Sequence, residues 1–270
     1  MWTPRTRWLR RAKALVSGLA QYADLDLEGN KVDRRTDFSQ AARPVLLLPG
    51  FLATRRSLSI LEHRLRRDGF SPFSLNLGGL LNTFNTHSIE ERAAFVRDKI
   101  ERLYERYPMG PLAIVGHSAG GLLGRFYIKR LGGHARVYAL ITLGSPHNGA
   151  YAAYLGAPFG PLFPSLREVR PMSGFIRRLK EGGFPKDVRL VSIYSKADKV
   201  ASFPSTLLET NGEQNLLNVD VLNVPHHRFL STKRIYEIVR REIHVAWASR
   251  VAAGAAPSVT LLRGGPKVTG

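Results

Sequence analysis

A serine in a glycine-rich turn is the residue of this chain best suited to nucleophilic chemistry. Ser118 lies in the run GHSAG at residues 116–120, directly after the apolar run 112–115 and before a helical pattern over 122–131. This is the G-x-S-x-G pattern of a nucleophile elbow, in which a sharp strand-to-helix turn exposes the serine hydroxyl and the glycines leave room for neighbouring backbone. The helix N-terminus supplies partial positive charge, which favours a developing oxyanion. We therefore expect Ser118 to be a nucleophile.

A serine hydroxyl needs a base to take its proton, and two later segments offer the base and its orienting carboxylate. With this elbow the order along the chain is serine, acid, histidine. Asp198 follows the apolar run 188–194, and His226 and His227 follow the run 219–224. Catalytic groups collect at the carboxyl ends of strands in open α/β sheets. We expect Asp198 to be the acid and one of these two histidines to be the base.

Other titratable residues near these positions have structural or solvated interpretations. Asp187 and Asp220 lie at the wrong ends of their predicted strands. His117 lies inside the elbow and is not able to fold back onto Ser118, and His147 is expected to shape the loop after the run 137–143. The remaining histidines are expected on helix faces or turns, and they are His63, His87, His134 and His244.

An oxyanion requires two N–H groups aimed at one point. One is expected from Ala119, directly after the nucleophile, and the other from Phe51, in the loop PGFL at 49–52 that follows the first apolar run. Both are backbone roles, so replacement of either side chain tests them only indirectly.

Apolar runs alternate with helical patterns from Pro44 onward. The six runs expected to form strands are 45–48, 73–77, 112–115, 137–143, 188–194 and 219–224. Helical spacing is present at 58–65, 88–107, 122–131 and 235–247, and the second of these opens with the capping-box pattern SIEE. The alternation predicts an α/β fold with right-handed βαβ units and a mainly parallel sheet covered by helices on both faces.

Composition divides the chain into three parts. Residues 1–43 are a basic N-terminal helix and connector, residues 44–249 form the catalytic domain, and residues 250–270 form a flexible tail rich in Gly, Ala and Pro. Within the domain, residues 150–187 interrupt the alternation with aromatic residues and prolines, which predicts a lid-like insertion. A mobile flap and a rigid excursion are both compatible with it.

The chain carries a formal charge of +19, from 40 basic and 21 acidic residues, and it has no cysteine. The missing thiols exclude disulfides, thiolate metal sites and cysteine catalysis. No apolar stretch is long enough to cross a membrane. Residues 1–13 hold five basic residues and no acidic one, so a helix on anionic lipid, a secretory signal and a helix packed beside the domain all stay open. Elsewhere the arginines are scattered, which argues against nucleic acid as a partner.

Three motifs together resemble those of bacterial lipases and esterases of the α/β-hydrolase superfamily. They are LLLPGF at 46–51, GHSAGG at 116–121 and TLGSPHNG at 142–149, and the resemblance covers about residues 44–247. It implies the α/β-hydrolase fold and a serine hydrolase that works through an acyl-enzyme, with no cofactor and no metal. In that family the catalytic histidine precedes apolar residues at fixed distances, which favours His226 over His227 because Phe229, Leu230 and Ile235 then fit.

The chain departs from the family in two places. No strands are evident before Pro44, which predicts a reduced core sheet. Ala119 stands where many lipases carry Met or Gln, which changes the wall of the oxyanion hole but not its N–H group.

The expected activity is hydrolysis of carboxylic esters, with lipid-like acyl esters favoured by the aromatic residues of 150–187. Acyl transfer, a thioesterase or amidase activity, and a non-catalytic binding role remain as alternatives. The expected location is cytoplasmic or peripheral on a membrane, with anionic lipid contacted through residues 1–13, and secretion stays open. Acyl chain length and oligomeric state are not determined by the sequence.

Overall fold

A computed structural model of the chain describes residues 38, 41, 43–51, 53, 55–75, 87–154 and 163–254. It contains one sheet of six parallel strands in the order β2-β1-β3-β4-β5-β6. The strands are β1 (Pro44–Leu48), β2 (Ser71–Ser74), β3 (Leu112–His117), β4 (Val137–Leu143), β5 (Arg189–Tyr194) and β6 (Leu216–Asp220). The predicted sheet of about six parallel strands is confirmed. The prediction of no strands before Pro44 concerns residues that lie mostly outside the described ones.

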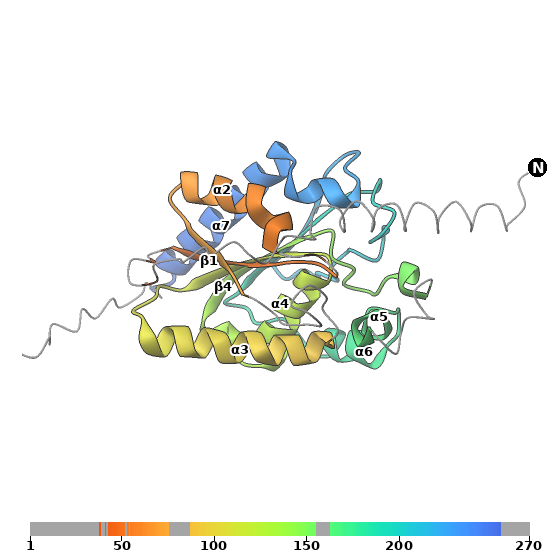
Figure 1. Ribbon diagram of the computed structural model, residues 1–270, viewed down its shortest axis with the longest axis horizontal. Helices are drawn as coiled ribbons and strands as arrows, with labels where there is room; N and C mark the ends of the chain where they lie inside the picture. Colours follow the sequence, from red (N-terminus) through yellow and green to blue (C-terminus); the bar gives the residue numbers. More distant parts are fainter. Residues whose placement is uncertain are drawn as a thin grey trace, which may run out of the picture.

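Helices cover both faces of the sheet (Figure 1). The α-helices are α2 (Ser59–Arg67), α3 (Ile89–Arg106), α4 (Ala119–Arg130), α5 (Pro164–Glu168), α6 (Gly174–Lys180) and α7 (Lys233–Ala252). Short 3-10 helices are η2 (Arg55–Leu58), η3 (Gly133–Ala135), η4 (Tyr151–Tyr154) and η6 (His226–Leu230). The α3 and α4 helices lie on one face, and α2 and α7 lie on the other.

Alternate residues of each strand supply the two cores. In β1, Leu46 and Leu48 pack in the cluster of α3 and α4, whereas Val45 and Leu47 pack in the cluster of α2 and α7. Every residue of β1, β3 and β4 is buried. Strands buried on both faces appear in the sequence as continuous apolar runs, which is why these three were predictable.

The helix α3 begins where its sequence predicts. The Ser88 hydroxyl accepts a hydrogen bond from the Glu91 N–H at 3.0 Å, and the Glu91 carboxylate accepts one from the Ser88 N–H at 2.8 Å. This reciprocal pair is a complete capping box.

Two strand predictions were shifted. The strand predicted at 73–77 is β2, which begins at Ser71 and includes Pro72; a proline is tolerated there because β2 is an edge strand. The strand predicted at 219–224 is β6, which ends at Asp220. Beyond it the chain turns through Asn223, whose φ is +56°.

The shift of β6 corrects the placement of Asp220, which lies at the carboxyl end of its strand and not at the wrong end. This strand is only half-buried, so its hydrophobic pattern is weak. The Asn218 amide makes two hydrogen bonds with the backbone of Leu208, at 2.8 and 3.0 Å. A polar side chain thus ties β6 to the segment before it, which an apolar pattern does not reveal.

Parts of the predicted domain organisation fall outside the described residues. These are the basic segment 1–13, most of the connector up to 43, residues 155–162 of the insertion and the tail beyond 254. The domain boundaries stay a prediction. Among the helices of the described residues, none has the length and apolar character needed to cross a membrane.

Candidate active site

Ser118 lies at the junction of β3 and α4 in a strained backbone conformation. Its φ is +53° and its ψ is −125°, which is rare for a residue with a side chain. The Ser118 N–H is held by the Leu143 carbonyl at 2.9 Å. A Cβ on Gly120 would lie 2.3 Å from the Leu48 carbonyl oxygen, so the turn needs glycine there. This is the backbone that a nucleophile elbow requires.

Asp198 and His226 are brought together from two different strand ends. The His226 Nδ1 lies 2.7 Å from the Asp198 Oδ2. The other carboxylate oxygen accepts hydrogen bonds from the N–H groups of Val200 at 2.8 Å and Ala201 at 3.0 Å. Because a carboxylate only accepts, the proton of the imidazole lies on Nδ1 and leaves Nε2 as the basic nitrogen. Both side chains are buried.

His226 and His227 differ sharply in environment. His226 is buried at the start of η6, followed by the buried Phe229 and Leu230. His227 is mostly exposed. The burial of part of its ring, followed by the charge of Arg228, lowers its pKa below the usual value. Only His226 contacts Asp198 among the described contacts of the two. The geometry favours the histidine that the resemblance favoured.

His117 buttresses the imidazole of His226, a role that the sequence did not indicate. The two rings lie 4.7 Å apart between centroids, and the His117 Nε2 lies 3.3 Å from the His226 carbonyl oxygen. Burial, and then the neighbouring His226, hold the pKa of His117 well below its usual range. A neutral ring therefore packs against the imidazole of His226.

Among the described residues, the Ser118 hydroxyl makes no hydrogen bond to the His226 imidazole. Catalytic hydrogen bonds are often long without substrate and tighten in the reactive complex. The arrangement brings Asp198 onto His226 and brings His117, the residue before Ser118, against that same imidazole.

The loop after β1 passes directly over the nucleophile. A Cβ on Gly50 would lie 3.0 Å from the Ser118 Cβ, so a glycine allows this close approach. The next residue, Phe51, packs edge-on against Phe163 with ring centroids 5.4 Å apart. Ala119 is the first residue of α4, where an N–H has no partner within the helix. Ala119 thus follows Ser118 directly, and Phe51 follows the glycine that approaches Ser118; their role in an oxyanion hole stays a prediction.

His147 is structural, as its position in the loop predicted. It is fully buried, with its Nε2 2.9 Å from the Thr142 hydroxyl and its Nδ1 3.4 Å from Arg125. Burial, followed by the charge of Arg125, holds the pKa of His147 well below its usual range. Within the described ranges, no group of three or more His, Asp or Glu side chains could hold a metal ion.

A shallow hollow of about 570 Å³ lies elsewhere, lined by residues of α7 and by Asp68 after α2. The Asp68 carboxylate accepts hydrogen bonds from the Tyr236 hydroxyl at 2.7 Å and from Arg240 at 2.9 Å. These bonds lower the pKa of Asp68 to about 2. This carboxylate is an anchor between helices rather than a candidate base.

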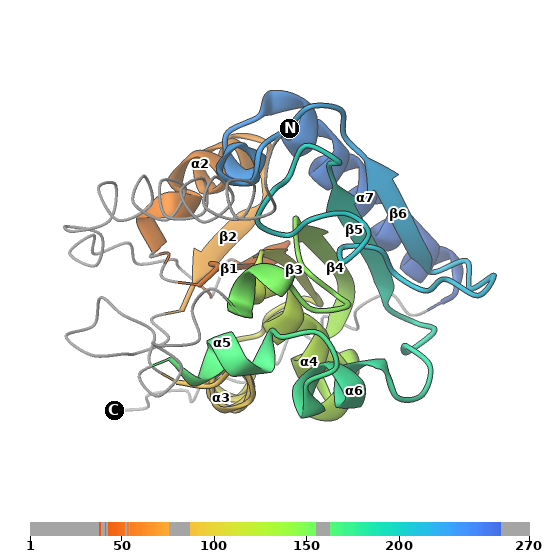
Figure 2. The ribbon, with the colours of Figure 1, turned by 90° about the vertical axis from the view of Figure 1, so that its right-hand side faces the viewer.

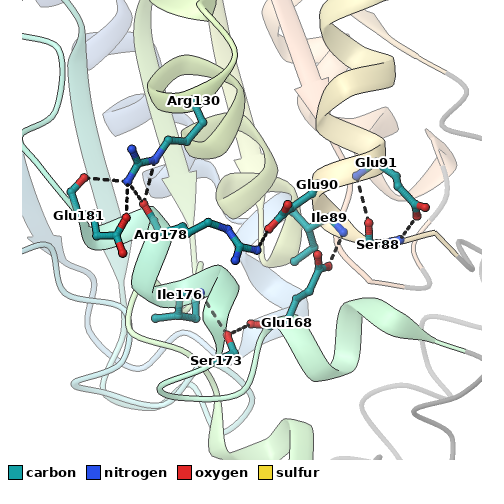
Figure 3. A network of polar contacts seen from close by, with 10 residues as sticks. All are labelled: Ser88, Ile89, Glu90, Glu91, Arg130, Glu168, Ser173, Ile176, Arg178 and Glu181. Atoms are coloured by element: carbon teal, nitrogen blue, oxygen red, sulfur yellow. Dashed lines mark hydrogen bonds and ion pairs between the residues drawn. The ribbon is translucent and has the colours of Figure 1, made fainter.

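The segment between β4 and β5, called the insert below and comprising residues 150–187, is attached to α3 and α4 (Figure 3). Glu168 of α5 accepts a hydrogen bond from the Ile89 N–H at the start of α3, and Arg178 of α6 pairs with Glu90. Burial raises the pKa of Glu168 to about 7, against the opposing effect of the α3 amides.

Two basic side chains of α4 complete the attachment of the insert. The Arg130 Nε donates to the Arg178 carbonyl at 2.9 Å. The Lys129 ammonium donates to the carbonyls of Leu179 at 3.0 Å and Gly182 at 2.7 Å. The described part of the insert is therefore docked on the helices beneath it.

Comparisons with known proteins agree with this architecture. A family model described as "PGAP1-like alpha/beta domain" matches residues 39–196. The chain is 27% identical over 143 residues to a GPI inositol-deacylase of Candida albicans, which covers 51% of this chain and 30% of the relative. It is 28% identical over 163 residues to the lysosomal thioesterase PPT2 homolog of Drosophila melanogaster, which covers 58% of this chain and 54% of the relative. The chain thus spans about a third to a half of these relatives.

Solved structures resemble the whole fold. A mature lipase of Bacillus licheniformis superposes with a TM-score of 0.62 at 12% identity, covering 80% of this chain and 96% of that one. A monoacylglycerol lipase of Paleococcus ferrophilus superposes with a TM-score of 0.57 at 15% identity, covering 76% of this chain and 94% of that one. Together with the six-stranded parallel sheet, these similarities confirm the predicted α/β-hydrolase fold of the lipase and esterase type.

Proposed function

The chain belongs to the family of PGAP1-like alpha/beta domains, and from this premise we propose that it is a serine hydrolase cleaving carboxylic esters of lipid-like acyl groups. The family and the relatives support a hydrolase: deacylase and thioesterase are among the relatives' names, and lipases share the fold. The single observation that carries the proposal for this chain is the buried Asp198–His226 hydrogen bond, at the same sheet edge as the strained Ser118.

In the proposed mechanism, the Ser118 hydroxyl attacks the ester carbonyl while the His226 Nε2 takes its proton. Asp198 holds the proton of Nδ1 and stabilises the imidazolium that forms. The imidazolium then protonates the leaving alcohol, which gives an acyl-enzyme on Ser118. A water molecule, deprotonated by the same imidazole, releases the acid and restores the hydroxyl.

The backbone N–H groups of Phe51 and Ala119 would bind the oxyanion of each tetrahedral intermediate. One such donor contributes about 3–4 kcal/mol of transition-state stabilisation, and base catalysis contributes about 10²–10⁴-fold in rate. Ala119 begins α4, and Phe51 directly follows Gly50. Close backbone packing at Gly50 and Gly120 fixes these two segments, so the donors need little reorganisation during reaction.

A lipid-like acyl group fits the apolar side chains near the site. Phe51 and Phe163 pack together beside the proposed oxyanion hole, and α5 starts directly after Phe163. Acyl groups are bound largely through apolar contact. One relative is named a GPI inositol-deacylase, so its name also describes removal of an acyl group.

A thioester is the second candidate substrate, because one relative is named a thioesterase. The same residues would act in the same order, with a thiolate leaving in place of an alcohol. Transfer of the acyl group to an alcohol acceptor in place of water would also use this set.

Replacement of Ser118 by Ala tests the proposal. Turnover of a soluble p-nitrophenyl ester should fall about 10⁴-fold or more, because the nucleophile is lost while the fold is kept. Ser249→Ala, at an exposed position of α7, is the matched control and should leave turnover unchanged. A folded Ser118→Ala protein that retains full turnover would refute the assignment.

Rates on matched oxyester and thioester substrates then separate the two candidates. Product analysis with an added alcohol separates hydrolysis from acyl transfer. Turnover of neither substrate by the folded wild-type protein would favour a non-catalytic binding role.

A further inference from the structure

Exposed apolar side chains concentrate around the proposed active site. Four loops at the carboxyl edge of the sheet, residues 148–154, 169–173, 195–205 and 221–228, are called the rim here. Among the described residues, nine large apolar side chains are exposed, and five of them belong to the rim: Tyr151, Tyr154, Met172, Phe203 and Leu222. Three are exposed by 70% or more: Met172 by 83%, Tyr151 by 73% and Leu222 by 70%. A concentration of this kind marks an interaction surface.

The loops of the rim are bonded to one another, so they form one surface. The Ala150 N–H donates to the Val169 carbonyl at 2.7 Å, and the Asn148 N–H donates to the Ser205 carbonyl at 2.8 Å. The Val224 N–H donates to the Ser195 hydroxyl at 3.1 Å. Asp198 and His226 belong to two of these loops, and Figure 2 views the molecule from this edge.

The charge of the rim is positive. Its basic side chains are Arg170, Lys196, Lys199 and Arg228. Its one carboxylate, Asp198, is buried and bonded to His226. Just outside the rim, Asp220 lies 3.9 Å from Lys196. Even if Asp220 neutralises Lys196, the rim keeps more basic than acidic side chains.

Cations and aromatic rings of the rim lie together. The Arg170 guanidinium lies 5.2 Å from the ring centre of Tyr154, and the Lys196 ammonium lies 5.4 Å from that of Phe203. Aromatic rings with basic side chains beside them are typical of surfaces that lie at the head-group level of a bilayer.

Unusual backbone conformations occur at or beside two of the exposed apolar side chains. Met172 has a φ of +62°, which is unfavourable for a residue with a side chain. It lies between Pro171, which packs against Gly149, and Ser173, whose hydroxyl caps α6 at 3.1 Å from the Ile176 nitrogen. Leu222 precedes Asn223, whose φ is +56°. The loops that carry Met172 and Leu222 therefore each contain a constrained backbone conformation.

We propose that the rim is a docking surface for an anionic lipid bilayer, with its apolar tips in the acyl boundary and its cations among the head groups. Docking in this way presents the edge that carries Ser118 to the lipid. The inference deepens the proposed function by naming the bilayer surface as the place where the enzyme reaches its ester substrate. Only this link between docking and substrate rests on the proposed function. A second copy of the chain is a poorer occupant, because a two-fold contact would oppose the same basic side chains.

Vesicle binding tests this surface without catalysis. Vesicles of ether-linked phosphatidylglycerol and of ether-linked phosphatidylcholine contain no acyl ester to cleave. We expect the wild-type protein to bind the anionic vesicles more tightly, and added salt to weaken that binding. Met172→Asp and Leu222→Asp should each weaken it by about tenfold, because an apolar tip is lost and a negative charge is added.

The matched control is Val245→Asp, a similar change at an exposed position of α7. Val245 lies twelve residues beyond the start of α7, about 18 Å along the helix axis. Turnover of a soluble ester should stay within about twofold of wild type in all three variants, since none of these residues is in the catalytic set.

Several results would overturn the proposal. They are equal binding to both kinds of vesicle, full binding by the two rim variants, or an equal loss in Val245→Asp. Conversion of a dimer to a monomer by Met172→Asp, with vesicle binding unchanged, would assign the surface to a second copy instead. Loss of ester turnover in Ser118→Ala is a separate readout, so failure of the docking surface and failure of the proposed function are distinguishable.

Discussion

The base of the insert and the rim lie a few residues apart and are built in opposite ways. The base of the insert is the set of contacts that join α5 and α6 to α3 and α4 through buried or paired polar groups. Glu168 accepts a hydrogen bond from the Ile89 N–H in the first turn of α3, and Arg178 forms an ion pair with Glu90. At the rim, the same insert exposes Tyr151, Tyr154 and Met172, one of them in a strained conformation. The base stabilises the insert, and the rim leaves apolar side chains in solvent.

The difference indicates that the described part of the insert is a fixed wall with exposed tips. A flap that opens by moving as a whole would need to break the bonds of Lys129, Arg130 and Glu168 together. We therefore infer that the rigid alternative applies to α5 and α6. Substitutions in the two regions should therefore have different main effects. Those at the base should mainly change stability, and those at the active-site edge and the rim should mainly change function.

After Ser118→Ala, the largest expected effect is that of Asp198→Asn. The amide keeps the shape of the side chain but no longer fixes the proton on the His226 Nδ1, so kcat for a soluble ester should fall about 10³–10⁴-fold. The melting temperature should shift little in comparison. Asp187→Asn, at an exposed position before β5, is the control and should keep full activity. A loss of only a few-fold in Asp198→Asn would show that another group orients the base.

A smaller effect is expected at the base, from Glu168→Ala. The change leaves the Ile89 N–H without its acceptor, which should lower the free energy of unfolding by about 1–3 kcal/mol. It also removes the carboxylate that lies near the buried Arg92 guanidinium, whose pKa burial lowers to about 10. Urea unfolding measures the loss, and turnover of a soluble ester should stay within a few-fold.

Glu181→Ala is the matched control for that loss. Glu181 pairs with Arg130 at 3.3 Å, but its side chain is 64% exposed, so its removal should matter by less than about 1 kcal/mol. Equal losses in both variants would mean that burial at the base is not what stabilises the insert.

The base should also give stability a pH dependence. The pKa of Glu168 is about 7 in the folded protein, against the usual 4.5. Between these two pH values the folded state holds the proton and the unfolded state does not. The stabilisation is therefore complete below about pH 4.5, decreases as the pH rises to about 7, and is absent above it.

Glu168→Gln isolates this dependence. Relative to wild type, the variant should gain about 1–2 kcal/mol of unfolding free energy between pH 5 and pH 8, after allowance for partial exposure. Urea unfolding at the two pH values measures the difference. The buried His117 and His147, whose pKa values are lowered, titrate alike in both proteins, so their contributions cancel in the difference. A difference that does not change with pH would contradict the assignment.

The sequence indicates the candidate site more readily than the base of the insert, because the candidate site depends on local patterns. The elbow at Ser118, and the places of Asp198 and His226 after their runs, follow from motifs of a few residues and from the parallel order of the strands. The contact of Ile89 with Glu168 joins residues 79 positions apart, and neither residue carries a pattern that indicates the other. The role of His117 was missed for the same reason, since it depends on a contact with the backbone of His226.

The smallest effect should come from Met172→Gly, and its sign opposes those at the base. Glycine adopts a φ of +62° without strain, so the free energy of unfolding should change by at most about 1 kcal/mol, toward greater stability, once the added entropy of the unfolded chain is subtracted. Asn223→Gly, at a φ of +56°, should gain less because asparagine already tolerates this region.

In the same Met172→Gly protein, binding to anionic vesicles should weaken while stability is kept or raised, since the exposed tip is gone. Urea unfolding and vesicle binding measured together check the pair of effects. A clear loss of stability would show that the Met172 side chain packs on the fold, and the rim would then resemble the base. A gain in stability with weaker vesicle binding would mean that the strain at this tip is kept for contact with lipid.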